Sequence, residues 1–292
     1  MTARTAANRI AGAPISWGVC EVSGWGYQLP AELVLREMQH LGLTATEFGP
    51  AGYLPSDPAD RADLLSSYGL AAAGGFVPVV LHDPGTDPAE VVDRALDGFG
   101  EPGSAVLVLA AATGAEGYEG RPELDADGWS TLLRNLDQAT ARAAQRGFTA
   151  TLHPHVGTMV ERQTEVQRVL DGGDTLLCLD TGHLLIGGTD PAELARQSPH
   201  RIGHVHLKDV SEPVAKNVAA GIISYTEGVS TGLYQPLGQG DVDVAGVVSA
   251  LEAHGYQGWY VLEQDTILHT APAGDGPVDD VQQSLRYLKG LL

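Results

Sequence analysis

The sequence lacks the features that mark membrane, secreted and disulfide-stabilised proteins. It has no apolar run of about 18 residues, the length that a transmembrane helix needs. Its opening residues, MTARTAANRI, lack the apolar core of a secretory signal. The two cysteines, Cys20 and Cys178, are too few for a disulfide framework. We therefore expect a reduced, cytoplasmic globular protein that has no membrane partner.

Positive charge is also scarce. The chain has 17 Lys and Arg against 37 Asp and Glu, a formal net charge of −20, and only three of the basic residues are lysines. Nucleic acids and anionic membranes both require a basic surface, so neither is expected as a partner. The acidic excess indicates either a solubilising surface or, in part, carboxylates gathered around a metal ion. The expected partner is a small molecule, and the choice between a monomer and a homo-oligomer stays open.

Strand-like and helix-like segments alternate regularly along the chain. Eight apolar runs resemble strands, and each is followed by a helical pattern without a break in composition. This alternation predicts a (β/α)8 TIM barrel that forms a single domain over residues 1–292. The alternative, a doubly wound open sheet, favours a glycine-rich phosphate turn after its first strand, and the sequence Ser16-Trp17-Gly18-Val19 is not one. The predicted strands are 10–16, 43–48, 70–80, 105–110, 148–152, 175–179, 202–207 and 259–262.

One long connection has no clear period. Residues 210–239 contain several glycines and neither a helical nor a strand pattern. A connection of this length in a compact domain is usually functional, so we expect a lid or a binding loop.

Polar residues that could bind a metal end three successive predicted strands. These residues are Asp180, His206 and Glu263. In a barrel, the C-terminal ends of the strands face one cavity. A hydrogen-bonding role at the rim would explain any one of them, but all three in register favour a divalent metal ion. Mixed carboxylate and imidazole ligation suits Mn²⁺, Co²⁺, Fe²⁺, Zn²⁺ or Mg²⁺ and excludes a thiolate site.

Two histidine-rich motifs add candidates for contact with a substrate. His183 follows Asp180 by three residues, beyond the strand end, which suits contact with a substrate hydroxyl. Lys208 lies two residues after His206 and shares its face of an extended chain, so it could point at a bound ketone. His204 has the same parity but lies one layer deeper, which favours a core role.

Other strand ends supply further candidates. Glu47 and His155 are expected to act in proton transfer, since carboxylates and imidazoles are common general bases. Trp17 and His153 also end predicted strands and are expected to bind the substrate.

Several motifs resemble the sugar phosphate isomerase/epimerase superfamily of xylose isomerase-like barrels. They are DTGH at 180–183, HVHLKD at 204–209, PLGQGD at 236–241 and EQD at 263–265. Within that superfamily, the motifs APISWG at 13–18, EFGP at 47–50 and HPHVGT at 153–158 resemble most the inosose dehydratases of inositol catabolism. The resemblance covers nearly the whole chain.

The resemblance implies a divalent metal bound by Glu, Asp, His and Glu from the fifth to the eighth strand. The last three map onto Asp180, His206 and Glu263. At the fifth strand this chain has His153 where many members have Glu, so either His153 is the ligand or Glu161 reaches back from the following loop. We favour Glu161, because three carboxylates and one imidazole form a hard donor set. Mn²⁺ or Co²⁺ is the expected ion, ahead of Mg²⁺ and Zn²⁺.

The resemblance also implies a reaction. We expect a metal-dependent lyase that dehydrates 2-keto-myo-inositol or a related keto-polyol through a metal-held enediolate. The abundance of imidazoles suits dehydration, which needs an acid for the departing hydroxyl, but the resemblance to the inosose dehydratases has more weight. A ketose 3-epimerase or sugar isomerase could use the same site. A third hypothesis is a non-catalytic sugar-binding barrel whose metal site has decayed.

Overall fold

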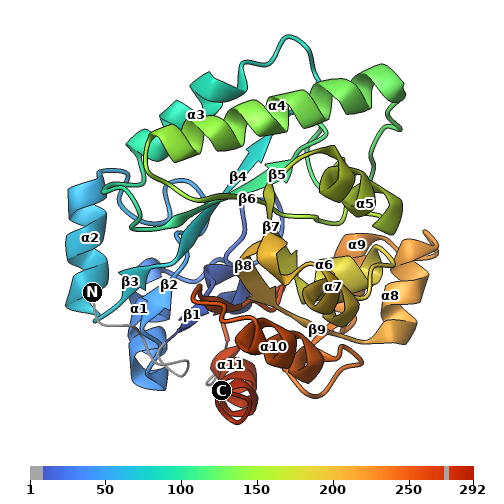
Figure 1. Ribbon diagram of the computed structural model, residues 1–292. Coiled ribbons are helices and arrows are strands. Elements are labelled where there is room, and N and C mark those ends of the chain that lie inside the picture. Colours follow the sequence, from blue (N-terminus) through green and yellow to red (C-terminus); the bar gives the residue numbers. More distant parts are fainter. Residues whose placement is uncertain (1–8, 273–275) are drawn as a thin grey trace.

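The protein folds as a barrel of parallel strands surrounded by helices (Figure 1). The computed structural model describes residues 9–272 and 276–292, so most of the opening stretch, Met1–Asn8, lies outside the described residues. The main sheet has nine strands in the order β3-β2-β1-β11-β8-β7-β6-β5-β4. These strands are β1 (Ile10–Gly12), β2 (Ala45–Thr46), β3 (Ala71–Ala72), β4 (Gly74–Val79), β5 (Val106–Ala111), β6 (Ala150–Leu152), β7 (Leu176–Asp180), β8 (Ile202–Leu207) and β11 (Tyr260–Leu262).

One predicted strand supplies both ends of this sheet and thereby closes the barrel. The run 70–80 forms β3 and β4, which are interrupted only at Ala73. The Ala73 backbone N–H donates to the carbonyl of Thr46 on one side (2.8 Å), and its carbonyl accepts from Val106 on the other side (3.0 Å). The predicted TIM barrel is therefore confirmed, with β3 and β4 together acting as its third strand.

Helices alternate with the strands and cover the outside of the barrel (Figure 1). Asp57, Asp87 and Asp190 each accept hydrogen bonds from the first turn of a helix that begins with proline, an arrangement that favours helix initiation. The helices of the described residues are α1 (Ala31–Leu41), α2 (Pro58–Ser67), α3 (Pro88–Asp97), α4 (Ala126–Gln145), α5 (Gln163–Gly172), α6 (Thr181–Ile186), α7 (Pro191–Gln197), α8 (Glu212–Ala219), α9 (Tyr225–Ser230), α10 (Val244–Ala253) and α11 (Val278–Lys289), with short 3-10 helices η2 (Pro14–Trp17) and η3 (Pro199–Arg201).

The start of α10 is capped as well. Asp243 accepts from the backbone N–H of Gly246 in its first turn. None of the helices among the described residues is long and apolar enough to cross a membrane.

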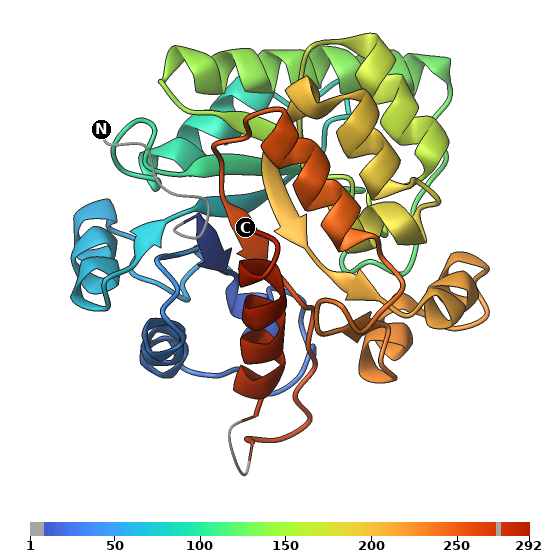
Figure 2. The ribbon, with the colours of Figure 1, turned by 60° about the horizontal axis from the view of Figure 1, so that its bottom comes forward.

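The long connection 210–239 is more ordered than its sequence indicates. It contains α8 and α9, and β10 (Tyr234–Gln235) pairs with β9 (Asp209–Val210) as a small antiparallel ribbon. Figure 2 shows α8 and α9, in light orange, together at one side of the molecule. Because each helix is short, neither produces a readable period in the sequence. The connection follows β8 and therefore stands at the C-terminal end of the barrel strands.

Asp209 ties this connection to the segment that follows it. The side chain is fully buried. Its Oδ1 accepts from the backbone N–H of Val210 (2.9 Å) and Val242 (3.0 Å), and its Oδ2 accepts from Gly238 (2.8 Å) and Gly240 (3.0 Å). One carboxylate thus satisfies four backbone donors.

Replacing Asp209 with Ala should therefore destabilise the protein strongly. Each buried donor left without a partner costs about 1–3 kcal/mol, so we expect a loss of at least about 3 kcal/mol. Thermal unfolding should show a fall in Tm of about 6 °C or more. The matched control is Asp243→Ala, which removes a helix cap and should cost about 1 kcal/mol. Equal Tm values for the two variants would contradict this assignment.

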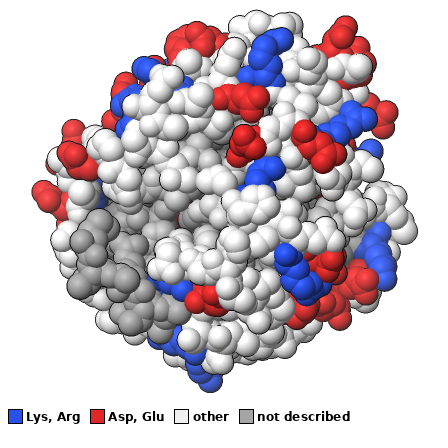
Figure 3. Space-filling model, viewed as in Figure 1, with Lys and Arg blue, Asp and Glu red and all other residues white. Residues whose placement is uncertain are grey.

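Charged side chains stand mainly near the outline of the face shown in Figure 3, where Lys and Arg are interspersed among Asp and Glu. Part of the acidic excess therefore lies on the surface. A second part lies inside the barrel mouth, where Glu47, Asp180, Glu263 and Asp265 are gathered.

Candidate active site

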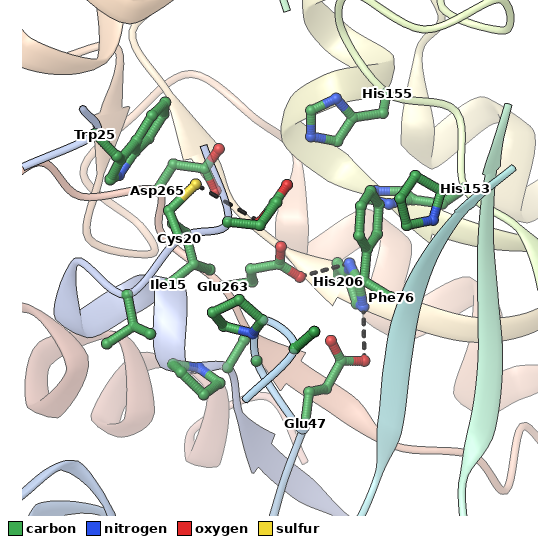
Figure 4. Close-up of a pocket in the computed structure, with 18 of the residues that line it drawn as sticks. Ile15, Cys20, Trp25, Glu47, Phe76, His153, His155, His206, Glu263 and Asp265 are labelled. Carbon is green, nitrogen blue, oxygen red and sulfur yellow. Dashed lines mark hydrogen bonds and ion pairs between the residues drawn. The ribbon is translucent and has the colours of Figure 1, made fainter. Parts of the chain in front are cut away.

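A cavity of about 230 Å³ opens where the barrel strands end (Figure 4). Its polar lining, called the polar wall, comes from the ends of strands β2, β6, β8 and β11. Its apolar and aromatic lining, called the apolar wall, flanks the polar residues, since Figure 4 shows Trp25 across the cavity and Phe76 beside His153 and His206. The polar wall includes Glu47, His153, His155, His206, Glu263 and Asp265. The apolar wall includes Ile15, Trp25, Phe76, Pro78 and Tyr118. A concave pocket with a few convergent polar groups is the usual form of a small-molecule site.

Three side chains, two in the polar wall and one buried behind it, converge as metal ligands do. Asp180, His206 and Glu263 offer ligand atoms that all lie within 4.8 Å of one another. His206 Nδ1 is 2.5 Å from Glu263 Oε2 and 3.6 Å from Asp180 Oδ2. Both His206 Nδ1 and Glu263 Oε2 are buried without a hydrogen bond. Two ligand-competent atoms this close together fit a shared divalent cation, and the carboxylate and imidazole donors suit one.

The charges around the cluster support the same conclusion. Three carboxylates, those of Asp180, Glu263 and Asp265, surround the ammonium group of Lys208. A fourth, that of Glu47, pairs with His206. Buried charges require compensation by an opposite charge. A divalent cation would supply most of the missing positive charge, so the residues present fit such an ion.

The fold orients Asp180 through the helix that follows it. Asp180 Oδ1 accepts from the backbone N–H of Gly182 and His183, both at 2.9 Å, and so caps α6. Its Oδ2 is left to face His153 Nε2, at 3.2 Å. Oδ1 therefore stabilises the start of α6, while Oδ2 faces the other side chains of the site.

The structure does not bring Glu161 to this cluster. Glu161 Oε2 accepts from the backbone N–H of Gly157 (2.8 Å) and pairs with Arg121 Nε (3.3 Å). Its carboxylate belongs to none of the potential ligand groups found among residues 9–272 and 276–292. His153, in contrast, is buried against Asp180. The structure therefore places His153, the alternative, beside Asp180, and places Glu161 with Arg121 and Gly157.

Figure 4 shows Glu47 and Glu263 at the two different nitrogens of the His206 ring. Glu47 Oε1 accepts from His206 Nε2 at 3.0 Å and from His204 Nε2 at 2.8 Å. Burial raises the pKa of Glu47, but the two imidazoles outweigh it and hold the pKa well below its usual range. A carboxylate behind a ligating histidine fixes which nitrogen faces the metal. This contact favours an orienting role for Glu47 over the proton transfer expected from its sequence position.

Replacing Glu47 with Gln should weaken metal binding without removing a ligand. Loss of a carboxylate behind a ligating histidine typically costs about 10–100-fold in metal affinity. Calorimetric titration of metal-free protein with Mn²⁺ measures this change. The matched control is Glu252→Gln, which loses the ion pair of Glu252 with Arg9 (2.7 Å) outside the cavity. Wild-type affinity in Glu47→Gln would show that Glu47 does not orient His206.

Lys208 is placed behind the cavity wall and not on it. Its Nζ lies 2.7 Å from Glu263 Oε1, 2.8 Å from Asp265 Oδ1 and 3.4 Å from Asp180 Oδ2. Burial lowers the pKa of Lys208, but the carboxylates of Asp180, Asp265 and Glu263 raise it well above its usual value. The residue therefore stays charged and orients carboxylates, in contrast to the expected contact with a ketone.

The imidazole of His155 belongs to the polar wall, and that of His183 packs behind it. His155 lines the cavity, and its Nδ1 donates to the carbonyl of Val156 at 2.7 Å, so that Nε2 keeps its lone pair. Burial, followed by the charge of His153, lowers the pKa of His155 to about 3. The ring of His183 lies 3.7 Å behind that of His155. His183 is buried there and does not line the cavity, unlike the substrate contact expected for it.

Trp17 does not reach the cavity either. It is fully buried, and its indole N–H donates to Glu37 of α1 at 2.7 Å. A strand followed directly by a 3-10 turn directs this side chain toward α1 and away from the cavity. Trp25 lines the cavity instead, with its indole N–H bonded to the carbonyl of Thr266 at 2.9 Å.

Sequence patterns missed several residues of the site. Asp265 lies two residues after Glu263, and the parity argument applied to Lys208 would have found it. Tyr225 and Tyr234 come from the long connection, and Tyr118 comes from the connection after β5. These three tyrosines lie in segments without a period, so the sequence holds no signal for them.

Comparison with known proteins relates this chain to a family. The model of the xylose isomerase-like TIM barrel family matches residues 35–291. An inosose dehydratase of Geobacillus thermodenitrificans (strain NG80-2) is 28% identical over 288 residues, which cover 95% of each chain. The rhizopine catabolism protein MocC of Rhizobium meliloti is 32% identical over 267 residues, 88% of this chain and 81% of that protein.

The fold also matches solved structures. One, described as L-ribulose 3-epimerase, has a TM-score of 0.68 over 97% of this chain and 94% of that chain, at 17% identity. At that level of identity the match shows the shared fold.

Proposed function

The chain belongs to the xylose isomerase-like TIM barrel family, and on that basis we propose that it is a metal-dependent lyase that dehydrates 2-keto-myo-inositol or a related keto-polyol. The observation that supports this most directly is the convergence of Asp180, His206 and Glu263 at a cavity that His206, Glu263 and His155 line. The relatives named inosose dehydratase support the reaction class.

The proposed metal site has four ligands. Asp180 Oδ2, His206 Nδ1 and Glu263 Oε2 would hold the ion, with His153 as the fourth ligand in place of a carboxylate. Bound there, Mn²⁺ or Co²⁺ supplies Lewis acidity that makes the proton beside a substrate carbonyl more acidic. Glu47 and Lys208 keep the ligands oriented from behind.

His155 is the proposed acid and base. Its Nε2 takes the proton from the carbon beside the carbonyl, because Nδ1 is committed to Val156. As the C–O bond at the neighbouring carbon breaks, the imidazolium returns that proton to the departing hydroxyl, which leaves as water. The proton removed from carbon leaves in the water molecule, and the electron pair of the broken C–H bond becomes part of the new double bond. No other reactant is therefore needed. His183, stacked behind, holds the ring in place.

The walls of the cavity support an uncharged ring polyol as the substrate. The described residues that line it include no Lys or Arg, whereas Glu21, Glu47, Glu263 and Asp265 present carboxylates. A phosphate or carboxylate on the substrate would meet like charge there. The apolar wall offers Trp25 and Phe76 to the C–H face of a ring.

Turnover tests the proposal and its alternative together. Purified protein with Mn²⁺ or Co²⁺ is incubated with 2-keto-myo-inositol in deuterium oxide, and the products are followed by mass spectrometry. Loss of one water supports the dehydratase. Deuterium in recovered substrate without loss of water would instead support a ketose 3-epimerase or isomerase. No reaction with either ion would reject this substrate.

A further inference from the structure

A short strap lies over the cavity, formed by residues 117–121 of the connection between β5 and α4. The Tyr118 ring lies 4.4 Å from that of His155, and its hydroxyl donates to the carboxylate of Glu21. The backbone of Tyr118 rests on Gly157, where a Cβ would overlap it and where φ is +77°. Only glycine combines that conformation with so close a contact.

The far end of the strap is anchored by Arg121. Its guanidinium bonds Glu165 at 2.8 and 2.9 Å and pairs with Glu161 at 3.3 Å. It also donates to the carbonyl of Thr158 at 3.2 Å. Glu161 therefore has a role in holding the strap to the loop that follows β6.

Glu119, between these anchors, connects the strap to α9. Its carboxylate accepts from the backbone N–H of Tyr225 and of Thr226, both at 3.0 Å, and from the Thr226 hydroxyl at 2.6 Å. Three donors at the start of α9 thus meet one exposed carboxylate from a segment that is about a hundred residues away in the chain.

Tyr225, whose backbone N–H donates to Glu119, also contacts the site through its side chain. The Tyr225 side chain is buried, and its hydroxyl donates to Asp265 and lies 2.9 Å from the Tyr234 hydroxyl. Its ring lies 6.1 Å from that of Tyr118 and 6.5 Å from that of Trp25. Tyr225 is therefore fixed at its backbone by the strap and at its hydroxyl by a carboxylate of the cavity.

We propose that Glu119 is a positioning residue. It holds α9 against the strap, so that Tyr225 keeps Asp265 and the rings of Tyr118 and Trp25 in place. The consequence for turnover rests on the proposed function. Glu119 touches no group of the cavity itself and acts through Tyr225. The strap and the connection after β8 thus complete the cavity together.

The test compares Glu119→Ala with Glu116→Ala. Glu116 is an exposed carboxylate of the same connection, and among the described residues it makes no hydrogen bond or ion pair. Hydrogen–deuterium exchange of residues 225–230 should become about tenfold faster in Glu119→Ala, since about 1.4 kcal/mol of local stability is lost. The kcat should fall about tenfold, with metal affinity and Tm close to wild type. Glu119→Gln, which keeps one acceptor oxygen, should recover part of both losses.

Equal exchange of residues 225–230 in the two Ala variants would overturn the proposal, and so would an unchanged kcat together with faster exchange. A fall in Tm of the size expected for Asp209→Ala would reveal a merely structural role. Exchange is measured without substrate, so it tests this contact even where 2-keto-myo-inositol is not converted. Absence of wild-type turnover would count against the proposed reaction alone.

Discussion

Replacing Asp180 with Asn is expected to abolish tight metal binding and to lower kcat by about 10³-fold or more, since a Lewis-acid metal contributes several kcal/mol to the transition state. The substitution separates the two tasks of the carboxylate. The amide oxygen can still accept from Gly182 and His183 and cap α6, as Oδ1 does at 2.9 Å. The amide nitrogen then faces His153 and the ion as a neutral donor, where a negative acceptor is required.

Asp190 provides a matched control for this substitution. It caps α7 with the same geometry, accepting from Ala192 at 2.9 Å and from Glu193 at 3.0 Å, and it does not line the cavity. Metal content after gel filtration, measured by mass spectrometry, should be lost in Asp180→Asn and retained in Asp190→Asn. Full metal content and wild-type kcat in Asp180→Asn would remove Asp180 from the site.

Replacing His155 with Phe should have the second largest effect. Phe keeps a ring to pack against His183 and Tyr118 but cannot take up a proton. General acid–base catalysis typically contributes about 10²–10⁴-fold, so kcat should fall by that factor. Metal content should be unchanged, because His155 is not among the proposed ligands.

Exchange of the substrate proton isolates the step assigned to His155. In deuterium oxide, His155→Phe should lose both dehydration and deuterium incorporation. His200→Phe, which changes an exposed histidine of η3, should behave as wild type. Rapid deuterium incorporation by His155→Phe would place the base elsewhere on the polar wall.

The barrel was predictable because its signals are local. Each strand is a short apolar run, and helix starts such as Asp87-Pro88 and Asp190-Pro191 carry their own caps. The positions of Asp180, His206 and Glu263 followed from the fold, since strand ends meet at one rim. Their ligand atoms lie within 4.8 Å of one another, which agrees with the predicted positions at one rim.

Side-chain direction was not predictable, because it depends on distant partners. Glu161 faces outward because Arg121, forty residues earlier, pairs with it. The Trp17 indole donates to Glu37 of α1, and the Lys208 ammonium group donates to Asp265 behind the polar wall. The spacing of residues within a motif gives no information about these contacts. The roles of Tyr118 and Tyr225 likewise depend on two connections meeting across the barrel mouth.

One measurement tests the central claim, that these residues hold a divalent ion required for dehydration. Protein treated with chelator is assayed with 2-keto-myo-inositol before and after stoichiometric Mn²⁺ or Co²⁺ is added. We predict no loss of water without metal and restoration of turnover with about one ion per chain, as expected for a site that supplies one Lewis acid. Equal turnover by metal-free and metal-loaded protein would contradict the account.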